Sequence, residues 1–208
     1  MPIHNLGLVS RGGEFQSVIA NSVYTDAGGN AFDIELGIHK IIQQLTYNRE
    51  QENSVYLIGN GGSAGIASHA LTDFLNVCRL RAFTLHDSSL ITCMANDFGY
   101  ENAYARIVNT VLRPGDTLIA ISSSGKSANI CNAAKMATEM GGVVVTLSGF
   151  HQDNPLRQLG DINVWLDSSD YGMVEIGHSF VLHNIADRIS AEIKKARAAT
   201  IPREILES

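Results

Sequence analysis

One arrangement occurs twice in this chain of 208 residues and limits its fold more than any other feature: a short apolar run, a Gly/Ser loop and then a helical stretch. The run at 54–58 leads into the loop 59–63, and the run at 116–121 leads into the loop 122–127. Continuous apolar runs of this length are typical of parallel strands, which are buried on both faces and need long crossovers. We therefore expect an α/β protein whose parallel sheet lies between helices.

Three further apolar runs complete a predicted sheet of five parallel strands. They lie at 81–85, 142–147 and 162–166. Apolar residues at helical spacing predict helices between and around these strands. The predicted helices cover about 31–49, 64 onward, 128–140 and 174–197.

This pattern predicts a single domain with an addition at each end. Residues 1–50 are expected to form an N-terminal helical arm, residues 51–198 the α/β domain, and residues 199–208 a C-terminal tail. Glycine pairs interrupt the apolar pattern near the start of the chain, so that only one helix, at about 14–24, is expected before residue 30.

Composition excludes several classes of protein. Hydrophobic residues make up 45% of the chain and charged residues 17%, as in a globular protein. The net charge of −6 argues against general nucleic-acid binding, which needs a basic face. A signal peptide is not evident, and no apolar run approaches the roughly 18 residues that span a bilayer, so a cytoplasmic protein is expected. The three cysteines are expected to be buried, reduced thiols: Cys78, Cys93 and Cys131.

The two Gly/Ser loops have the properties of a phosphate-binding site. Glycine lets a backbone approach a ligand closely, and the helix that follows offers unpaired N–H groups and the positive end of its dipole. Ligands of parallel α/β sheets bind outside the carboxyl ends of the strands, where both loops lie. The alternative is that the loops are only tight turns with serine caps. The hydroxyl groups available to an anion belong to Ser63, Ser122, Ser124 and Ser127.

A nucleotide-binding P-loop is a competing interpretation of the second loop. Residues 120–127 match the P-loop pattern GxxxxGK[ST] except that Ala120 replaces the first glycine. That position is expected to lie inside the strand, which leaves too short a loop to wrap a nucleotide phosphate. Loss of any ATP turnover in Lys126→Ala would be the test of this alternative.

Four motifs in order resemble a known family. They are Gly-Asn-Gly-Gly-Ser at 59–63, Ala-Asn-Asp-Phe-Gly at 95–99, the serine loop at 121–129, and a late helix with Glu175 and His183. This order resembles the sugar-isomerase (SIS) domain and, more closely, the bacterial phosphoheptose isomerases. Those enzymes interconvert sedoheptulose 7-phosphate and D-glycero-D-manno-heptose 7-phosphate through an enediol.

The resemblance covers about residues 55–188 and implies a fold, an assembly and a site. It implies a five-stranded parallel sheet between helices and a homotetramer with sites at subunit boundaries. Its metal positions, expected to hold Zn²⁺, correspond to His69, Asp73, Glu175 and His183, and its acid/base pair to Asp73 and His183. The implied substrate-binding residues are Asn60, Gly61, Gly62, Ser63, Asp97, Ser122, Ser123, Ser124 and Ser127.

These residue types suit aldose–ketose isomerisation, which needs a base for a carbon-bound proton, an acid at oxygen and a group that stabilises negative charge. His69 and Asp73 are spaced i, i+4 and share a helix face. Glu175 and His183 lie about 80° apart around their helix and can border one cleft. Imidazole and carboxylate groups are ligands that Zn²⁺ accepts. The alternative for His69 is a hydrogen-bonded core residue, and for Asp73 a solvated position.

The other histidines are expected to lie outside this set. His178 points to the opposite side of its helix from His183, about 140° away. His86 and His151 are interpreted as surface or loop residues.

The chain also departs from the family that it resembles, which leaves other functions open. Asp73 stands where the phosphoheptose isomerases carry Glu, and Glu175 where they carry Gln. One branch of the family is non-catalytic and binds the replication initiator DnaA, and in that branch the acidic residue of the first helix and the final histidine tend to be lost. Because Asp73 and His183 are present, we favour the enzyme over the DnaA-binding protein and over a sensor of sugar phosphates.

Overall fold

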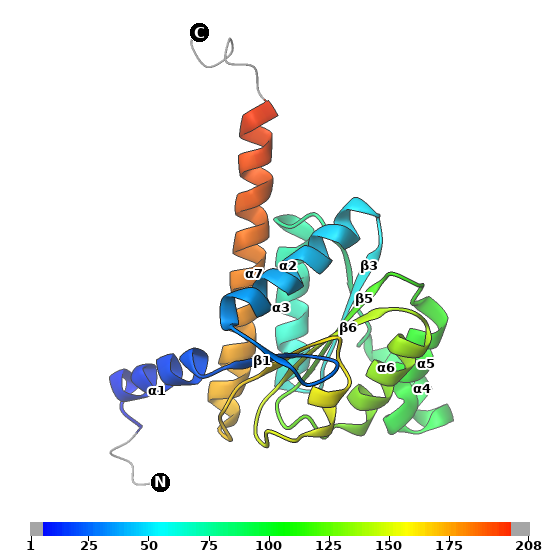
Figure 1. Cartoon of the computed structure of the whole chain (residues 1–208). Coiled ribbons are helices and arrows are strands. Elements are labelled where there is room, and N and C mark those ends of the chain that lie inside the picture. Colours follow the sequence, from blue (N-terminus) through cyan, green and yellow to red (C-terminus); the bar gives the residue numbers. More distant parts are fainter. Residues whose placement is uncertain (1–5, 201–208) are drawn as a thin grey trace.

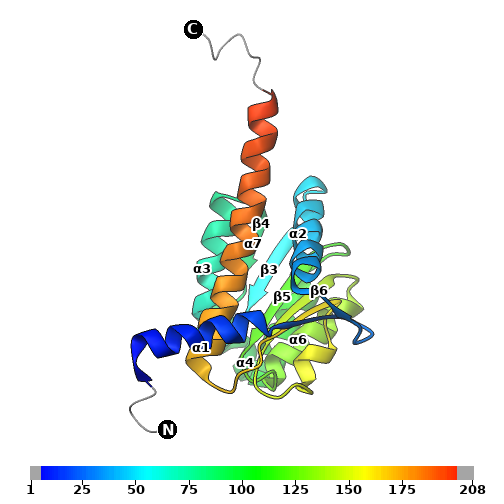
Figure 2. The same cartoon turned by 60° about the vertical axis from the view of Figure 1, so that its left-hand side comes forward.

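The fold is a twisted sheet between two layers of helices, seen in a computed structural model that describes residues 6–200 (Figures 1 and 2). Within these residues the sheet has seven strands in the order β2-β1-β7-β6-β5-β3-β4. Strands β4, β3, β5, β6 and β7 are parallel to one another, which confirms the five predicted parallel strands. Their bounds are Arg81–Thr84 (β4), Ser54–Ile58 (β3), Thr117–Ser122 (β5), Val143–Ser148 (β6) and Ile162–Trp165 (β7).

A hairpin extends the sheet beyond the five parallel strands. Strand β1 (Val23–Asp26) pairs antiparallel with β7, and β2 (Ala31–Phe32) pairs antiparallel with β1. The Asp26 carboxylate accepts hydrogen bonds from the backbone N–H groups of Gly28 and Asn30, which fixes the turn. The sequence analysis did not predict these strands, because the Gly-Gly pair in the turn interrupts runs that are only four and two residues long.

The helix predicted at 14–24 begins and ends earlier. The observed helix α1 spans Leu8–Ala20. The last two residues of the predicted helix, Val23 and Tyr24, belong to strand β1 of the hairpin. Figure 2 shows α1 extending from the body of the molecule across the start of α7. Leu8 and Val9 on this helix are almost fully exposed.

The helices divide between the two faces of the sheet. One face is covered by α2, α3 and α7, and the other by α4, α5 and α6. The 3₁₀ turns Tyr100–Asn102 and Pro155–Gln158 lie in the connections. The helix bounds are Ile34–Glu50 (α2), Gly62–Asn76 (α3), Ser88–Phe98 (α4), Ala103–Val111 (α5), Ala128–Glu139 (α6) and Tyr171–Thr200 (α7).

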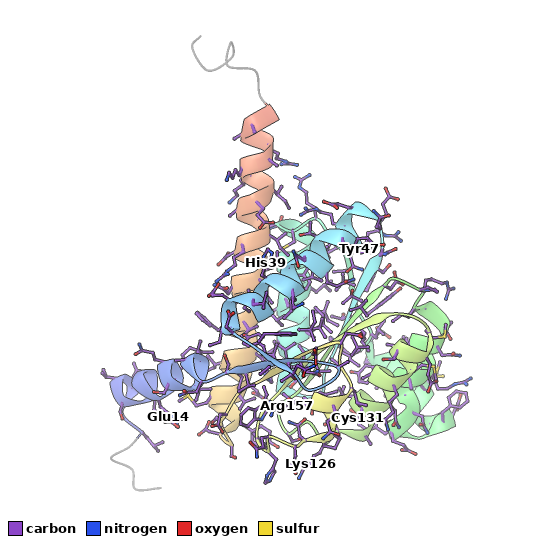
Figure 3. The ribbon with its side chains drawn as sticks, in the orientation of Figure 1. Glu14, His39, Tyr47, Lys126, Cys131 and Arg157 are labelled. Carbon is purple, nitrogen blue, oxygen red and sulfur yellow. The ribbon has the colours of Figure 1, made fainter. Side chains whose placement is uncertain are left out.

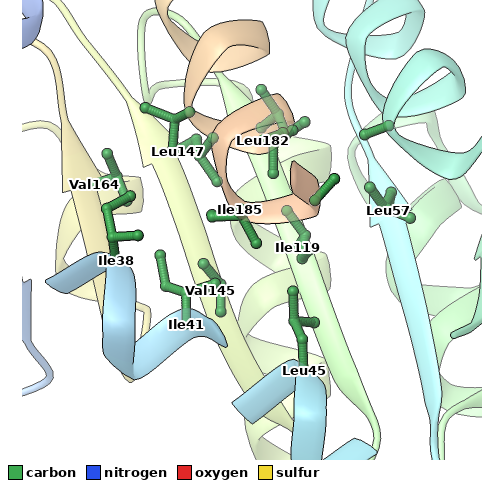
Figure 4. Packing of buried hydrophobic residues seen from close by; sticks show 14 of the residues in the cluster. Ile38, Ile41, Leu45, Leu57, Ile119, Val145, Leu147, Val164, Leu182 and Ile185 are labelled. Atoms are coloured by element: carbon green, nitrogen blue, oxygen red, sulfur yellow. The ribbon is translucent and has the colours of Figure 1, made fainter. Parts of the chain in front are cut away.

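Alternation along the central strands builds a core on each side. Leu57 and Ile119 contact α2, α3 and α7 on one side (Figure 4), while their neighbours Ile58 and Leu118 face α5 and α6 on the other. Successive strand side chains point to opposite faces, so a continuous apolar run is what a doubly covered sheet requires. All four of these side chains are fully buried.

The arrangement of the strands brings the two Gly/Ser loops together. Strands β3 and β5 are adjacent and parallel, with Ile58 paired to Ala120. Their carboxyl ends therefore open at the same edge of the sheet, where α3 and α6 begin. The two phosphate-binding loops predicted from the sequence are neighbours for this reason.

Two smaller expectations have different outcomes. Cys78 and Cys131 are buried free thiols, as predicted, but Cys93 is exposed. Cys93 lies on α4, a helix of which no residue is buried, so its apolar sequence neighbours do not enclose it.

Within the described part of the chain, no helix has both the length and the apolar character needed to cross a membrane.

Candidate functional site: two Gly/Ser loops and a histidine–aspartate cluster

The first loop is a tight turn in which glycine is required twice. Gly61 has φ of +53°, a backbone conformation that side chains disfavour. Gly59 packs so closely on the backbone of Ser63 that a Cβ atom would overlap it. The hydroxyl of Tyr104 donates a hydrogen bond of 2.8 Å to the Gly59 carbonyl and anchors the loop from the opposite layer. The turn presents the start of α3, with its free N–H groups, to the edge of the sheet.

The second loop is held by serine and asparagine side chains. The Ser122 hydroxyl donates to the Ser127 hydroxyl at 3.2 Å, and the Lys126 N–H donates to the Ser124 hydroxyl at 3.3 Å. Gly125 has φ of +63° and lies against the buried side chain of Asn154. The loop is therefore held in its fold by hydrogen bonds among its own residues.

The P-loop alternative does not suit this geometry. Ala120 lies within β5 and is fully buried, so the loop starts only at its end, as the sequence analysis expected. The side chain of Lys126 is exposed at the outer edge of the molecule (Figure 3) and does not line the cavity between the loops. A P-loop lysine must reach the phosphates of its nucleotide.

Between the loops lies a cavity of about 280 Å³. Hydroxyl, amide and backbone groups form most of its wall, and no lysine, arginine or histidine of the described chain lines it. A phosphate here would be held by neutral donors and by the N-termini of α3 and α6. The lining residues are Asn60, Gly61, Gly62, Ser63, Ile121, Ser122, Ser123, Ser124, Ser127, Tyr171 and Glu175.

Eight of the nine predicted substrate-binding residues line this cavity; the exception is Asp97. Asp97 is exposed on α4, where its carboxylate accepts a hydrogen bond from the Asn96 amide at 2.9 Å. Within one chain the structure does not bring Asp97 to the loops. Tyr171, which the sequence analysis missed, joins the cavity from the first turn of α7. Its position four residues before Glu175 was the available signal.

Asn60 is held in a network at the mouth of the first loop. Its side-chain amide exchanges two hydrogen bonds of 2.9 Å with the amide of Asn129. The Tyr100 hydroxyl donates a further hydrogen bond of 2.9 Å to the Asn60 Oδ1 atom. Neither Tyr100 nor Asn129 was singled out from the sequence, because their role depends on contacts 40 and 69 residues apart.

A second group of polar residues lies further along the same pair of helices. His69 and Asp73 on α3 face His183 on α7, and the ligand atoms of these three side chains lie within 4.8 Å of one another. The Asp73 carboxylate is 3.0 Å from Nδ1 of His183, and the two imidazole rings have centroids 4.8 Å apart. The predicted i, i+4 face of α3 is confirmed as the face that meets α7.

The chemistry of this donor set fits a zinc ion. Two imidazoles and one carboxylate are N and O ligands that Zn²⁺ binds, and three protein ligands with a free position are typical of catalytic zinc. With no metal bound, Asp73 can accept a hydrogen bond from Nδ1 of His183, which leaves Nε2 free to accept a proton.

Glu175, the fourth predicted ligand, lies elsewhere. It precedes His183 by eight residues, which is about 12 Å along the axis of α7. Its carboxylate is not part of the His69, Asp73 and His183 group but lines the cavity between the loops. It packs against Gly62 at the start of α3, where a Cβ atom would overlap the carboxylate.

The histidines at 178, 86 and 151 lie outside the cluster, as predicted. His178 is fully buried, with Nε2 donating to the Ser148 carbonyl at 3.1 Å, and burial lowers its pKa to about 4. His86 is a half-buried loop residue whose Nε2 lies 2.8 Å from the Ser68 hydroxyl, and burial lowers its pKa as well. His151 is exposed in a loop.

The SIS domain family matches residues 32–149, which include both strand–loop–helix units. The chain belongs to the SIS-domain family. This SIS-domain chain is similar to phosphoheptose isomerase of Mycobacterium bovis, with 39% identity over 141 residues, 65% of the chain and 71% of the relative. It is 34% identical to phosphoheptose isomerase of Trichlorobacter lovleyi over 73% of the chain and 80% of the relative.

Solved structures of the same kind share the fold of this SIS-domain chain. Phosphoheptose isomerase from Neisseria gonorrhoeae superposes with a TM-score of 0.76 at 23% identity, covering 88% of this chain and 97% of that one. A phosphoheptose isomerase from Francisella tularensis gives 0.74 at 25% identity, covering 89% and 98%. The chain is thus a SIS-domain protein related to the phosphoheptose isomerases.

Proposed function

We propose that the protein is a sugar-phosphate aldose–ketose isomerase that converts sedoheptulose 7-phosphate into D-glycero-D-manno-heptose 7-phosphate. The observation that carries this proposal is that the same two helices, α3 and α7, contribute to both the cavity and the cluster. The N-terminal ends of these helices border a hydroxyl-lined cavity suited to phosphate, and their facing sides carry His69, Asp73 and His183. The similarity to phosphoheptose isomerases supports the choice of a seven-carbon sugar.

In this proposal the loops bind and the cluster moves protons. The serine hydroxyls and the ends of α3 and α6 hold the phosphate, and Asn60, fixed by Asn129 and Tyr100, orients the sugar hydroxyls. His183, oriented by Asp73, transfers the proton between C1 and C2. A Zn²⁺ ion held by His69, Asp73 and His183 would polarise the substrate carbonyl. When the sugar binds, His183 would hand over from metal ligand to base.

We also propose that the working form is a homotetramer. Ile176 and Phe180 are large exposed apolar side chains on α7, and Leu8 and Val9 are exposed on α1. Exposed apolar residues that gather on neighbouring elements favour association. Light scattering of the purified protein should give four times the mass of one chain, and a monomer at micromolar concentration would contradict this part.

The test of the activity is proton NMR of sedoheptulose 7-phosphate with the protein in D₂O, with and without Zn²⁺. We expect a new aldoheptose phosphate with deuterium at C2, because an enediol exchanges that proton with solvent. The control is His151→Asn, a loop histidine distant from the cluster in sequence and exposed, which should react like the unmodified protein. Binding of the sugar phosphate without any conversion would contradict the isomerase.

The metal assignment has its own test. The protein should bind about one Zn²⁺ per chain, and His69→Ala should lower that amount because it removes one of three ligands. Metal content measured by atomic absorption after dialysis decides the point. An unchanged zinc content in His69→Ala would contradict the assignment of His69 as a ligand.

A further inference from the structure

The carboxylate of Glu175 has an unusual position for a site that binds an anion. It lines the same cavity as the serines of both loops and packs on Gly62, the first residue of α3. Among the described residues it has no hydrogen-bond or ion-pair partner, although it is half-buried. A negative charge therefore lies, without a fixed partner, where a phosphate is expected.

The charge balance of the cavity makes this position significant. Among residues 6–200, no lysine, arginine or histidine lines the cavity, so no cationic side chain of this range neutralises the carboxylate. A phosphate monoester adds a charge of about −1.5 to −2 at neutral pH. Two anions close together in a partly enclosed space repel each other more strongly than in bulk water. As placed in the structure, Glu175 opposes phosphate binding.

The same helix leads from Glu175 to the His69, Asp73 and His183 cluster. Glu175 and His183 are separated by two turns of α7, about 12 Å along its axis. A Glu side chain has three rotatable bonds, and Glu175 is held by no hydrogen bond. A divalent cation in the cluster would attract this carboxylate along α7 towards His183 and away from the loops.

We propose that Glu175 couples the loop cavity to the His69, Asp73 and His183 cluster. A divalent cation in the cluster and a phosphorylated ligand in the cavity then bind with positive cooperativity. This inference rests on the proposed function, because it requires phosphate between the loops and a cation at the cluster. Without the cation the carboxylate competes with phosphate for the start of α3. With the cation the carboxylate turns from the loops towards the cluster, and the cavity accepts the ligand. By linkage, the phosphorylated ligand must tighten cation binding by the same factor.

The experiment measures binding and not turnover. Metal-stripped protein is titrated with glucitol 6-phosphate, which has a phosphate but no carbonyl to isomerise, by calorimetry with and without one equivalent of Zn²⁺. For the unmodified protein we expect Zn²⁺ to lower the Kd of this probe about tenfold, within the usual range of coupling between sites. Glu175→Gln removes the charge and keeps the size, so it should bind the probe tightly without Zn²⁺ and show a ratio near one.

Glu192→Gln is the matched control, since it removes the same charge from the same helix 17 residues away. That distance, about 25 Å along the axis, exceeds the screening length in physiological salt. Glu192→Gln should keep the tenfold ratio. A ratio of ten in Glu175→Gln, or a ratio near one in the unmodified protein, would overturn the coupling while leaving the phosphate site intact. No probe binding by any of these proteins would overturn the phosphate site itself, and with it the coupling.

Discussion

The loop cavity and the histidine–aspartate cluster lie on the same two helices but are built in opposite ways. The cavity is formed by backbone and short side chains at the ends of central strands, and Ser63, Ser122 and Ser123 in its wall are no more than 5% exposed. The cluster consists of longer side chains on helix faces, and the side chain of His183 is 45% exposed. The first is fixed by the fold, whereas the second is open to ligands and to partner chains.

This difference in rigidity suits the cavity and the cluster to different tasks. Rigid backbone donors bind an anion without losing conformational freedom when it arrives, which is the benefit of a preorganised site. Exposed imidazoles and carboxylates can change partners, as proton transfer and metal binding require. On the proposed function, the loop cavity is the binding half of the site and the cluster is its reacting half. In metal-free protein, substitutions should affect the two halves separately.

The largest effect is expected from breaking the reacting half alone. His183→Asn keeps a side chain that can hydrogen-bond Asp73 but removes the imidazole that transfers the proton. Isomerisation should fall about 10³-fold, within the range for loss of a general acid/base. In metal-stripped protein the Kd for glucitol 6-phosphate should change less than threefold, because the cavity is untouched. A loss of binding as large as the loss of turnover would contradict the separation of the two halves.

The second largest effect is a loss of stability when a methyl group is added to the second Gly/Ser loop. Gly125→Ala places a methyl group at φ of +63° and into the side chain of Asn154, which is 1% exposed and donates to the His151 carbonyl at 2.9 Å. We expect the free energy of unfolding in urea to fall by about 3 kcal/mol, from backbone strain plus the displaced hydrogen bonds.

Gly65→Ala is the control for this substitution. Gly65 lies in the first turn of α3, and a Cβ atom there would meet no heavy atom within 4 Å. Alanine should stabilise the helix by up to about 1 kcal/mol. If Gly125→Ala were as well tolerated as Gly65→Ala, the second loop would be flexible and the contrast between a rigid and an open half would be lost.

The binding half could be predicted from the sequence and the geometry of the reacting half only in part. A strand, a Gly/Ser loop and a helix are contiguous in sequence, so 59–63 and 122–127 specify their own local structure. The cluster depends on which faces of α3 and α7 meet. The i, i+4 spacing predicts that His69 and Asp73 share a face, and the resemblance pairs them with His183.

Sequence spacing alone did not place Glu175. An angle of 80° around α7 is compatible with one cleft, but the 12 Å of axial separation decides which part of the cleft each residue reaches. The hairpin of β1 and β2 was missed for a related reason: two very short strands acquire their identity from pairing with β7, a long-range contact. Where tertiary contacts decide, local patterns are insufficient.

A smaller effect depends on pH and concerns His178, which joins α7 to the sheet. His178 of α7 donates to the Ser148 carbonyl at the end of β6, and burial lowers its pKa from 6.5 to about 4. The unfolded chain therefore binds a proton that the folded chain does not bind between pH 6.5 and 4, so stability decreases as the pH falls through this window. We expect a loss of about 2 kcal/mol between pH 7 and pH 5.

The matched variant is His178→Gln, whose amide can donate to the Ser148 carbonyl but does not titrate. Its free energy of unfolding should be lower than that of the unmodified protein at pH 7, because the ring also fills space in the core. The dependence on pH between 7 and 5 should be flatter by about 2 kcal/mol. Parallel curves for the two proteins would mean that His178 is protonated in the folded state.

The smallest effect tests the binding half without touching the reacting half. Replacing both Ser124 and Ser127 with alanine removes two neutral hydroxyl donors from the cavity but leaves the backbone N–H groups and the helix ends. The Kd for glucitol 6-phosphate should rise about tenfold, the scale of one to two neutral hydrogen bonds. Zinc content should stay at the unmodified level, and Ser89→Ala on exposed α4 should change neither quantity. A double variant that binds the probe normally yet isomerises slowly would mean that these hydroxyls act on the reacting atoms, and the division between a binding half and a reacting half would have to be redrawn through the second loop.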